Sequence, residues 1–419
     1  MKILFAALAL PFPPTNGHRL RNQALLRALR DEGHEISLVS FADDHTADAK
    51  HGELGEICKS VELIPLPWDS SGVSGSYGQR LRSLASPMPY GAWRHRSKAM
   101  SSAIEELLRR EQFDGILCDD IYNIQNLPAA TRVPVILNKH DITHVILERY
   151  LAYEKNLLKV GYGWLEYAKL RRWELQACSK AAMVLACSEH DANLLRAGCP
   201  NAELAVVPNV IDVDSYAPAD EDDDRTVLYI GALDWLPNQD AVKFFASEIL
   251  PKLREIVPAA RFRVVGRNTP EEVQHRLERI PGLEFVGSVP DIRAELAKAS
   301  ICVVPLRIGS GTRLKILEAA AMGKAVVSTR VGAEGLNLAN GTEILLADDP
   351  ADFAQAVAGL LADHSRRREM GSAACRRVRQ DYSLSALRKA VRQALGAPLA
   401  YLPGVEEEVS EAVARRVPS

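Results

Sequence analysis

"R-I-G-S-G-T-R-L-K-I-L-E-A-A-A-M-G-K-A-V-V-S-T-R-V" is the sequence of residues 307–331, and it predicts a loop and a helix between two buried strands. The flanking runs, 301–306 and 325–329, are short, rich in Val, and lack the alternation of a sheet with one wet face. Thr312 is the expected N-cap of the helix, and Gly323 is the expected residue just past its C-terminus. The stretch therefore indicates an α/β fold.

The start of this helix is suited to an anion. Gly309 and Gly311 leave the loop without side-chain cover, and the N–H groups of a helix N-terminus favour a phosphate. Arg313 and Lys315 add positive charge where the helix dipole alone would favour acidic residues. Glu318 follows on the same face, where it can accept two hydrogen bonds from a vicinal diol. Phosphate plus diol indicates a nucleotide; the alternative is a plain surface ion pair between Lys315 and Glu318.

Length and composition limit the classes of protein. A chain of 419 residues suggests two domains of roughly 150–200 residues each. The net charge of −3 gives no reason to expect nucleic acid as a partner. The seven cysteines form no C-x-x-C pair, so we expect buried, reduced thiols in a cytoplasmic protein, without a zinc site or disulfides. No apolar run is long enough to cross a bilayer, so any membrane contact is expected to be peripheral.

The N-terminal segment predicts a strand, a helix and a second strand. The strand covers 2–10, the helix 19–32 and the next strand 35–41. A right-handed crossover places the first loop at the carboxyl edge of a parallel sheet, where ligands bind in open α/β folds. Gly17 and Arg19 are therefore expected at the acceptor or diphosphate edge of the site.

Two later features belong to the same half of the chain. His140 directly follows a predicted strand at 134–138, so it is expected on the same edge as Gly17. A lone histidine is as often structural as catalytic, and its position favours a catalytic role. Residues 144–180 predict one long helical segment that carries aromatic and basic side chains. Such a segment can face a lipid or a glycan, but an amphipathic helix packed on the domain is the favoured interpretation.

The composition then changes, and the alternation of strand and helix starts again. The predicted organisation is an N-terminal Rossmann-like domain (1–208), an acidic linker (209–225), a C-terminal Rossmann-like domain (226–382), and a crossover helix with a tail (383–419). The expected fold class is α/β, with two Rossmann-like domains that face each other across a cleft.

Several motifs, in this order and spacing, resemble those of the retaining nucleotide-sugar glycosyltransferases of family four. These enzymes have the B-type fold of two Rossmann-like domains, and the resemblance covers nearly the whole chain. It implies that the N-terminal domain (1–208) binds the acceptor and that the C-terminal domain (226–382) binds the donor. It is nearest to a branch associated with bacterial surface or exopolysaccharide assembly. The motifs are Pro-Pro-x-x-Gly at 13–17, Val-Pro-Asn-x-x-Asp at 207–212, Gly231 with Trp-x-Pro-Asn-x-Asp at 235–240, Phe-x-Gly-x-Val-x-Asp at 285–291, and Gly-x-Gly-x-x-x-Lys-x-x-Glu from Gly309 to Glu318.

The resemblance implies roles for particular residues. Glu318 matches the second glutamate of the family's E-x7-E motif, which holds the nucleotide ribose, and His140 matches the histidine over the donor sugar. These two are the expected catalytic residues, and Arg313 and Lys315 are expected to face the diphosphate. The implied donor-binding set is Gly231, Asn238, Gly287, Val289, Gly309, Ser310, Gly311, Thr312, Arg313, Lys315 and Glu318.

The chain departs from the family pattern at two places. Ser310 stands where the first glutamate of the motif belongs, so Ser310 or the backbone of the glycine loop must replace its contacts to sugar hydroxyls. Ala232 and Asn238 stand near the positions of the family's usual Arg and Lys, which shifts the expected diphosphate contact further onto Arg313 and Lys315.

The implied activity is transfer of a sugar from a nucleoside-diphosphate sugar, UDP favoured over GDP, to a hydroxyl of a glycan, a lipid-linked glycan or a small molecule. Retention of anomeric configuration is expected, with no metal and no further cofactor. The implied location is the cytoplasm, with peripheral contact to the inner membrane as an option. Two alternatives stay open: a nucleotide-sugar epimerase of the same fold, and a non-catalytic nucleotide-sugar-binding subunit, which Ser310 favours. The sequence leaves the sugar, the acceptor and the oligomeric state open.

Overall fold

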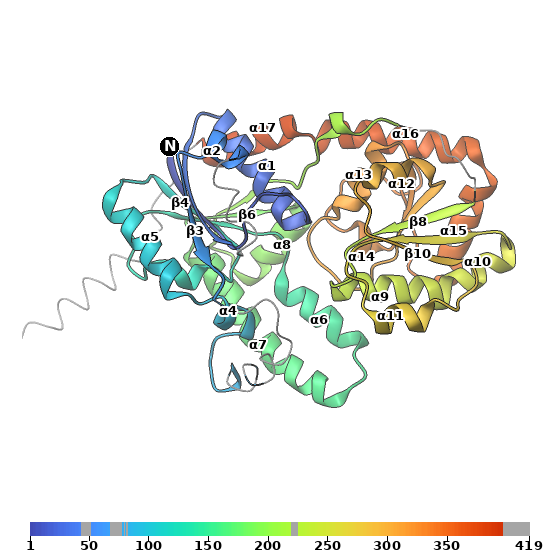
Figure 1. The fold of residues 1–419 in the computed structure, drawn as a ribbon, viewed down its shortest axis with the longest axis horizontal. Helices are drawn as coiled ribbons and strands as arrows, with labels where there is room; N and C mark the ends of the chain where they lie inside the picture. Colours follow the sequence, from blue (N-terminus) through green and yellow to red (C-terminus); the bar gives the residue numbers. More distant parts are fainter. Residues whose placement is uncertain (43–51, 68–77, 79, 81–82, 219–224, 397–419) are drawn as a thin grey trace, which may run out of the picture.

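The computed structural model describes residues 1–42, 52–67, 78, 80, 83–218 and 225–396. Two α/β domains lie side by side, each built on one sheet with helices on both faces (Figure 1). The expected fold class is confirmed. The acidic run at 220–224 and the tail after 396, for which sequence-based expectations were given, lie outside the described residues.

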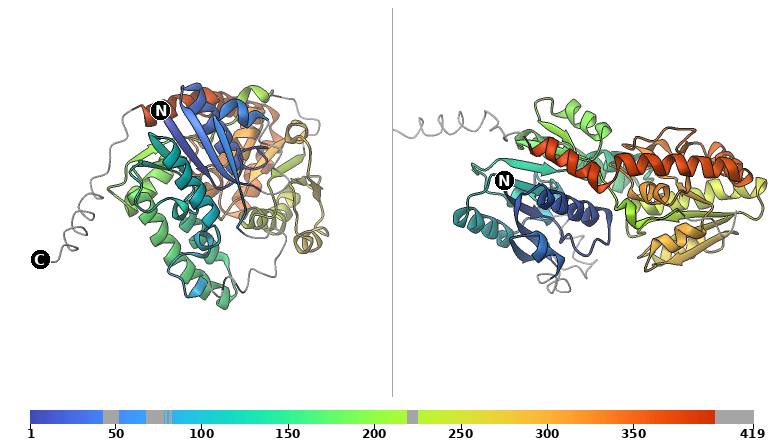
Figure 2. Two further views of the ribbon diagram at one scale, coloured as in Figure 1. Left: turned by 60° about the vertical axis from the view of Figure 1, so that its left-hand side comes forward. Right: turned by 90° about the horizontal axis from the view of Figure 1, so that it is seen from above.

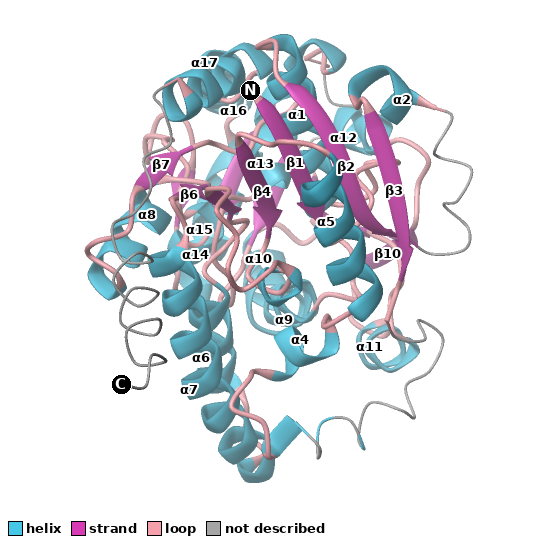
Figure 3. Ribbon diagram, turned by 90° about the vertical axis from the view of Figure 1, so that its left-hand side faces the viewer, coloured by secondary structure: helices cyan, strands magenta, loops and turns pink. Residues whose placement is uncertain are grey.

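The N-terminal sheet has seven strands in the order β3-β2-β1-β4-β5-β6-β7, and neighbouring strands pair in parallel (Figure 3). The first strand lies in the middle, so the sheet is doubly wound and has its carboxyl edge beside the second domain. The strands are β1 (Lys2–Ala7), β2 (Glu35–Ala42), β3 (Ser60–Pro65), β4 (Gly115–Asp119), β5 (Val135–Asn138), β6 (Met183–Ala186) and β7 (Leu204–Val206).

Alternate residues of β1 enter different halves of the core. Ile3 and Phe5 pack with α1, whereas Leu4 packs with α5 on the opposite face. Both faces are dry, which explains why the strands read as continuous apolar runs. The helices and 3₁₀ turns of this domain are α1 (Gly17–Asp31), α2 (Glu53–Ile57), α4 (Tyr90–Arg94), α5 (Lys98–Arg110), η2 (Ile124–Asn126), α6 (Thr143–Tyr153), α7 (Leu157–Lys180), α8 (Glu189–Gly198) and η3 (Val213–Ser215).

The C-terminal sheet has six parallel strands in the order β10-β9-β8-β11-β12-β13. These are β8 (Thr226–Ile230), β9 (Arg261–Val265), β10 (Leu283–Gly287), β11 (Ile301–Val304), β12 (Ala325–Ser328) and β13 (Leu345–Leu346). The helices are α9 (Leu236–Phe244), the π-helical turn η4 (Phe245–Ile249), α10 (Leu250–Ile256), α11 (Glu271–Leu277), α12 (Ile292–Lys298), α13 (Leu314–Ala321), α14 (Arg330–Ala333), α15 (Pro350–Ala362), α16 (His364–Asp381) and α17 (Leu384–Leu395).

Two local expectations were wrong. Residues 144–180 form two helices, α6 and α7, because the Glu154 carboxylate accepts from the N–H of Lys155 and Asn156, and Asn156 then caps α7. Thr312 does not cap α13: Arg313 occupies the N-cap position, and the Thr312 hydroxyl accepts a hydrogen bond from Asn209 instead. Gly323 does follow the end of α13, with a φ of 70°.

The last two helices run along both domains (Figure 2). α16 packs on α13 in the C-terminal domain, and Ser383 then caps α17. Leu387 and Val391 of α17 join the core of the N-terminal domain beside α1. Among the described residues, no helix combines the length and hydrophobicity needed to cross a bilayer.

The packing of α16 on α13 predicts a difference between two glycine substitutions. A Cβ at Gly371 would lie 1.9 Å from the carbonyl oxygen of Gly323, so Gly371→Ala is expected to destabilise the protein by about 1–3 kcal/mol. A Cβ at Gly359, an exposed position of α15, would meet no atom within 4 Å. Gly359→Ala is therefore expected to stabilise by about 0.5–1 kcal/mol. Urea unfolding of the two variants beside the wild type checks this, and equal midpoints would contradict the close packing.

Candidate active site

A cleft of about 1210 Å³ lies between the two domains. Its N-terminal wall comes from the loop after β1, the start of α1 and the segment after β5. Its C-terminal wall comes from the loops after β8 and β10 and from the glycine loop with the start of α13. Both walls are carboxyl edges of parallel sheets, where open α/β folds bind ligands.

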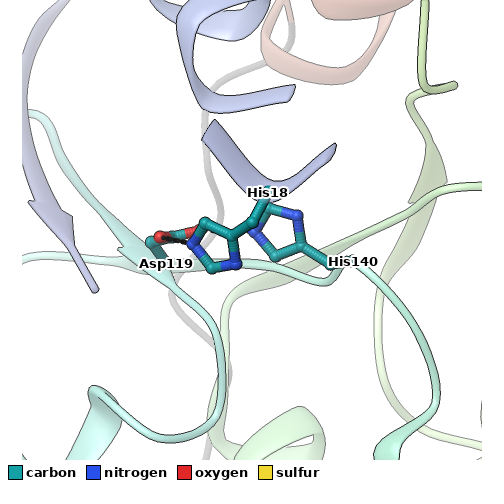
Figure 4. A group of neighbouring side chains, drawn as sticks. All are labelled: His18, Asp119 and His140. Atoms are coloured by element: carbon teal, nitrogen blue, oxygen red, sulfur yellow. Dashed lines mark hydrogen bonds and ion pairs between the residues drawn. The ribbon is translucent and has the colours of Figure 1, made fainter. Parts of the chain in front are cut away.

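Three side chains form the centre of the N-terminal wall. Asp119 is fully buried at the end of β4, and its two oxygens lie 2.7 Å from Nε2 of His18 and 2.6 Å from Nε2 of His140 (Figure 4). The two imidazole rings stack with centroids 3.9 Å apart. The Asn22 and Asn138 amides and the backbone N–H of Leu8 also donate to Asp119.

This arrangement separates the charges of the two histidines. Burial alone would raise the pKa of Asp119, but the histidines beside it hold that pKa well below its usual range. Burial alone would lower the pKa of His18, but the Asp119 carboxylate raises it above the ordinary value. Burial and the neighbouring His18 lower the pKa of His140 to about 4. The cluster therefore favours a proton on His18 over one on His140, whose ring is neutral at neutral pH.

The same three residues lie close enough together to be considered as metal ligands. The hydrogen bonding of Asp119 argues against that use, because its oxygens already accept from five N–H donors. A metal ion would have to displace several of them. The cluster fits a hydrogen-bonded array better than a metal centre.

The glycine loop reaches across the cleft to the N-terminal domain. The Ser310 hydroxyl accepts from the Ile142 N–H at 3.0 Å and lies 3.3 Å from an Asp191 oxygen. A Cβ at Gly311, whose φ is 74°, would lie 2.4 Å from the carbonyl oxygen of His140. The carbonyl of Gly309 accepts from Arg149. The polar atoms of the loop are thus largely committed to contacts between the domains.

The Arg313 guanidinium, which is expected to face a diphosphate, is engaged in hydrogen bonds with backbone carbonyls beside it. It donates to the carbonyl oxygens of Ser310, Gly311 and Val331. Arg313 is the N-cap residue of α13 and has an extended backbone. Its side chain therefore lies beside the carbonyl groups of the loop that leads into the helix. Arg313 lines the cleft, but its contacts hold the shape of the glycine loop.

Lys315 and Glu318 face the cleft from the first turns of α13. Nζ of Lys315 lies 2.9 Å from the Tyr229 hydroxyl and 3.0 Å from Oδ1 of Asn238. Glu318 accepts from the Tyr216 hydroxyl at 3.3 Å. The alternative of a plain surface pair is therefore wrong, because Lys315 bonds to other residues. Burial and the nearby Arg313 lower the pKa of Lys315 to about 7, and burial raises the pKa of Glu318.

The other expected site residues are divided between the cleft and its surroundings. Gly17, Gly231, Asn238, Val289 and Thr312 line the cleft. Gly287 ends β10 with a φ of 83° and leads into the lining segment 288–293. Arg19 does not belong to the described lining; His18 and Leu20, on either side of it, do.

Sequence reasoning missed His18 and Asp119. Both carried a usable signal: Asp119 ends the strand that precedes the one leading to His140, and His18 follows Gly17 at the start of α1. Because the carboxyl ends of parallel strands meet at one edge of the sheet, these signals place His18 and Asp119 at the same edge as His140. What the sequence could not give is that one carboxylate binds both rings.

Comparison with known proteins agrees with this geometry. The family described as "Glycosyltransferase Family 4" matches residues 15–215, and the family described as "Glycosyl transferases group 1" matches residues 224–363. The two matches lie one on each domain.

One relative matches over most of its length. A phosphatidyl-myo-inositol mannosyltransferase of Mycolicibacterium smegmatis is 25% identical over 86% of this chain and 85% of its own. The solved structure of sucrose-phosphate synthase from Thermosynechococcus elongatus superposes with a TM-score of 0.69 at 16% identity, covering 98% of this chain and 99% of that one.

Another fold match is Anabaena Alr3699/HepE, solved in complex with UDP-glucose, with a TM-score of 0.65 at 14% identity over 94% of this chain and 99% of that one. These structural likenesses show the shared fold. With both domains matched by the family and the cleft between them, the chain belongs to the family-four glycosyltransferases of the two-domain B-type fold.

Proposed function

We propose that this glycosyltransferase moves a sugar from a nucleoside-diphosphate sugar, with UDP as the nucleotide, to an acceptor hydroxyl with retention of configuration and without a metal ion. The observation that carries the proposal is the pairing of two walls across one cleft. The start of α13, with Lys315 and Glu318, lies on one side, and the cluster of His18, Asp119 and His140 lies on the other.

The C-terminal wall supplies what a nucleotide needs. The free N–H groups at the start of α13 and the ammonium of Lys315 offer positive charge to a diphosphate. Glu318 lies one turn further on and can accept both hydroxyls of a ribose. Support for UDP comes from the HepE and TarM structures, which were solved with UDP or a UDP-sugar.

The N-terminal wall supplies groups for the reacting sugar. Because Asp119 accepts at Nε2 of His140, the neutral ring keeps its proton there and Nδ1 remains an acceptor for a sugar hydroxyl. His18 lines the same cleft, and the Asp119 carboxylate raises its pKa, which favours the protonated ring. A protonated His18 would partly compensate for the missing Arg and Lys at the positions of Ala232 and Asn238.

The transfer requires separation of charge without a covalent enzyme intermediate. The bond between the anomeric carbon and the β-phosphate oxygen breaks, and the departing diphosphate gains negative charge that Lys315, His18 and the α13 N-terminus stabilise. The acceptor oxygen bonds to the anomeric carbon from the face that the diphosphate leaves. Its proton passes to a phosphate oxygen. Neither step calls for a metal ion or a further cofactor.

Acceptor class and cellular location belong to the same proposal. A hydroxyl on a glycan, a lipid-linked glycan or a small molecule is consistent with the open N-terminal side of the cleft. The relative named a phosphatidyl-myo-inositol mannosyltransferase supports including lipid-linked acceptors. We place the reaction in the cytoplasm, where nucleotide sugars are available, in polysaccharide assembly.

A non-catalytic nucleotide-sugar-binding subunit is the remaining alternative, and the epimerase is less consistent with the family. Ser310 was the reason to consider a subunit without activity. Its hydroxyl bonds to Ile142 and Asp191 of the N-terminal domain. At the position where the family has a glutamate, this chain therefore has a contact between the two domains. Incubation of UDP-sugars with and without acceptors, followed by product analysis, separates transfer, epimerisation and binding alone.

Calorimetric titration with UDP and GDP tests the donor site. A charge-assisted bond from Glu318 to the ribose is worth roughly 1.5–3 kcal/mol, so Glu318→Ala is expected to weaken UDP binding about tenfold or more. Glu284→Ala serves as the control, because Glu284 is a half-exposed carboxylate of the same domain outside the cleft. Equal affinity in wild type and Glu318→Ala would remove the nucleotide assignment.

Substitution of His140 separates chemistry from binding. His140→Ala is expected to lower kcat by about 10²-fold or more while UDP affinity changes less than about threefold, because the ring acts on the sugar. Asp119→Asn should lower kcat as well, since it removes the charge that orients the ring. Equal losses in kcat and in affinity for His140→Ala would show a structural role instead.

The depressed pKa of Lys315 predicts uptake of a proton on binding. With a pKa of about 7 in the free protein, Lys315 is mostly neutral at pH 8.5, and a bound diphosphate favours its protonated form. UDP affinity is therefore expected to be constant below pH 7 and to fall as the pH rises above it. Calorimetry at pH 8.5 in two buffers of different ionisation enthalpy should give close to one proton bound per UDP.

Lys315→Met is the control for this measurement. It should bind UDP more weakly and show no proton uptake at the same pH. An identical heat in both buffers for the wild-type protein would mean that Lys315 does not contact the diphosphate.

A further inference from the structure

A group of apolar side chains lies exposed where α6 ends and α7 begins. Leu157 and Leu158 are 84% and 86% exposed, and Tyr153, Trp164 and Leu165 are between 43% and 48% exposed. We call these five residues the apolar tip. Figure 1 shows the helical pair α6 and α7 extending away from the rest of the N-terminal domain. Leucine side chains this exposed gain nothing from folding and indicate a surface that contacts something else.

The tip continues along one face of α7. With 3.6 residues per turn, positions 157, 164, 165 and 168 fall on the same side of the helix. The other sides are occupied: Glu166 accepts from the N–H of Tyr90, Lys169 donates to the carbonyl of Ser83, and Gly163 packs against Leu151. The exposed apolar face is therefore distinct from the packed one.

Basic side chains border the tip. Lys155 and Lys159 are exposed at its end, and Arg171 and Arg172 are exposed two turns further along the same face. The acidic groups nearby are Glu154, which lies 3.9 Å from Lys159, and the exposed Glu148 on α6. The apolar tip is thus bordered by four basic and two acidic side chains, and this excess of positive charge suits an anionic lipid surface. Tryptophan side chains favour the level of the lipid headgroups, which suits Trp164.

The tip is connected to the cleft by a single helix. α6 starts at Thr143, three residues after His140, and its 11 residues span about 16 Å. The ring of Tyr153, at its far end, stacks with Arg307 at 4.5 Å, beside the glycine loop. A surface bound to the tip would lie about one short helix away from the reaction centre.

We propose that the apolar tip docks this protein onto a lipid bilayer containing anionic headgroups. The proposal rests on the proposed glycosyl transfer in one respect: docking brings the cleft within reach of an acceptor anchored in that bilayer, and so favours the lipid-linked class of acceptor. Leu157, Leu158 and Trp164 enter the interface, and Lys155 and Lys159 contact the headgroups.

Flotation with vesicles tests the docking surface. The full-length protein is expected to bind vesicles of phosphatidylcholine with about one third phosphatidylglycerol, and Leu157→Asn with Leu158→Asn should lower partitioning at least about tenfold. Lys155→Gln with Lys159→Gln should weaken binding by roughly fivefold for each lysine on these vesicles and leave binding to pure phosphatidylcholine unchanged.

Trp164 emission should shift to the blue on binding, a change absent in Trp164→Phe.

The matched control is Ile256→Asn, which removes an exposed apolar side chain from α10 in the other domain and should leave partitioning unchanged. Equal flotation of the wild type and the double leucine variant would overturn the proposal. A dimer of the wild-type protein that forms without lipid and is absent in the double leucine variant, as measured by sedimentation velocity, would also overturn the proposal. The tip would then join two copies of the chain.

UDP titration of the same preparations keeps the two proposals apart. The double leucine variant should bind UDP as the wild type does, because the tip lies outside the cleft lining. Binding of UDP without binding of vesicles would refute the docking surface alone. Binding of vesicles without binding of UDP would refute the proposed donor and leave the surface in place.

Discussion

The buried carboxylate of Asp119 is the constraint on which the reaction centre depends. A charge removed from water is strongly unfavourable unless hydrogen bonds and an opposite charge replace the solvent. Here five N–H donors do so, and they come from the loop after β1, from α1 and from the end of β5. These segments can satisfy the carboxylate only by meeting at one point. The same requirement holds His18 stacked on His140, and it raises the pKa of His18 while that of His140 is lowered.

A second buried charge orients the segment that carries His140. Lys139 and Glu174 are both almost fully buried and form an ion pair at 2.6 Å. The same Glu174 oxygen accepts from the Thr143 N–H, and the other oxygen accepts from the N–H and the ring of His144. Glu174 thereby caps the start of α6, because the N-cap residue Ile142 has no side-chain acceptor of its own. Burial would raise the pKa of Glu174, but Lys139 and His144 lower it to about 2. The start of α6 is thus held beside the cleft while its other end reaches the apolar tip.

The two domains meet through the glycine loop. Asn209 donates to Thr312, the Ile142 N–H donates to Ser310, and Arg149 forms an ion pair with Glu334 at 2.6 Å. The absence of a side chain at Gly311 is what allows the backbone of His140 to approach. Because the glycine loop before α13 and the segment that carries His140 share these contacts, the position of one domain determines the geometry offered by the other. Closing of such a cleft excludes water from the reacting groups.

The sequence by itself determined the alternation of strand and helix in both halves of the chain, the place of α13 and the position of Gly323. These follow from apolar runs and turn residues, which are properties of neighbouring positions in the chain. It also placed Lys315 and Glu318 on one helical face. Only the tertiary structure decided that Asp119 binds His18 from 101 positions away, because any of several polar side chains at that edge could have met it. It also turned Arg313 onto loop carbonyls, since a flexible side chain takes whichever acceptors the folded backbone places within reach.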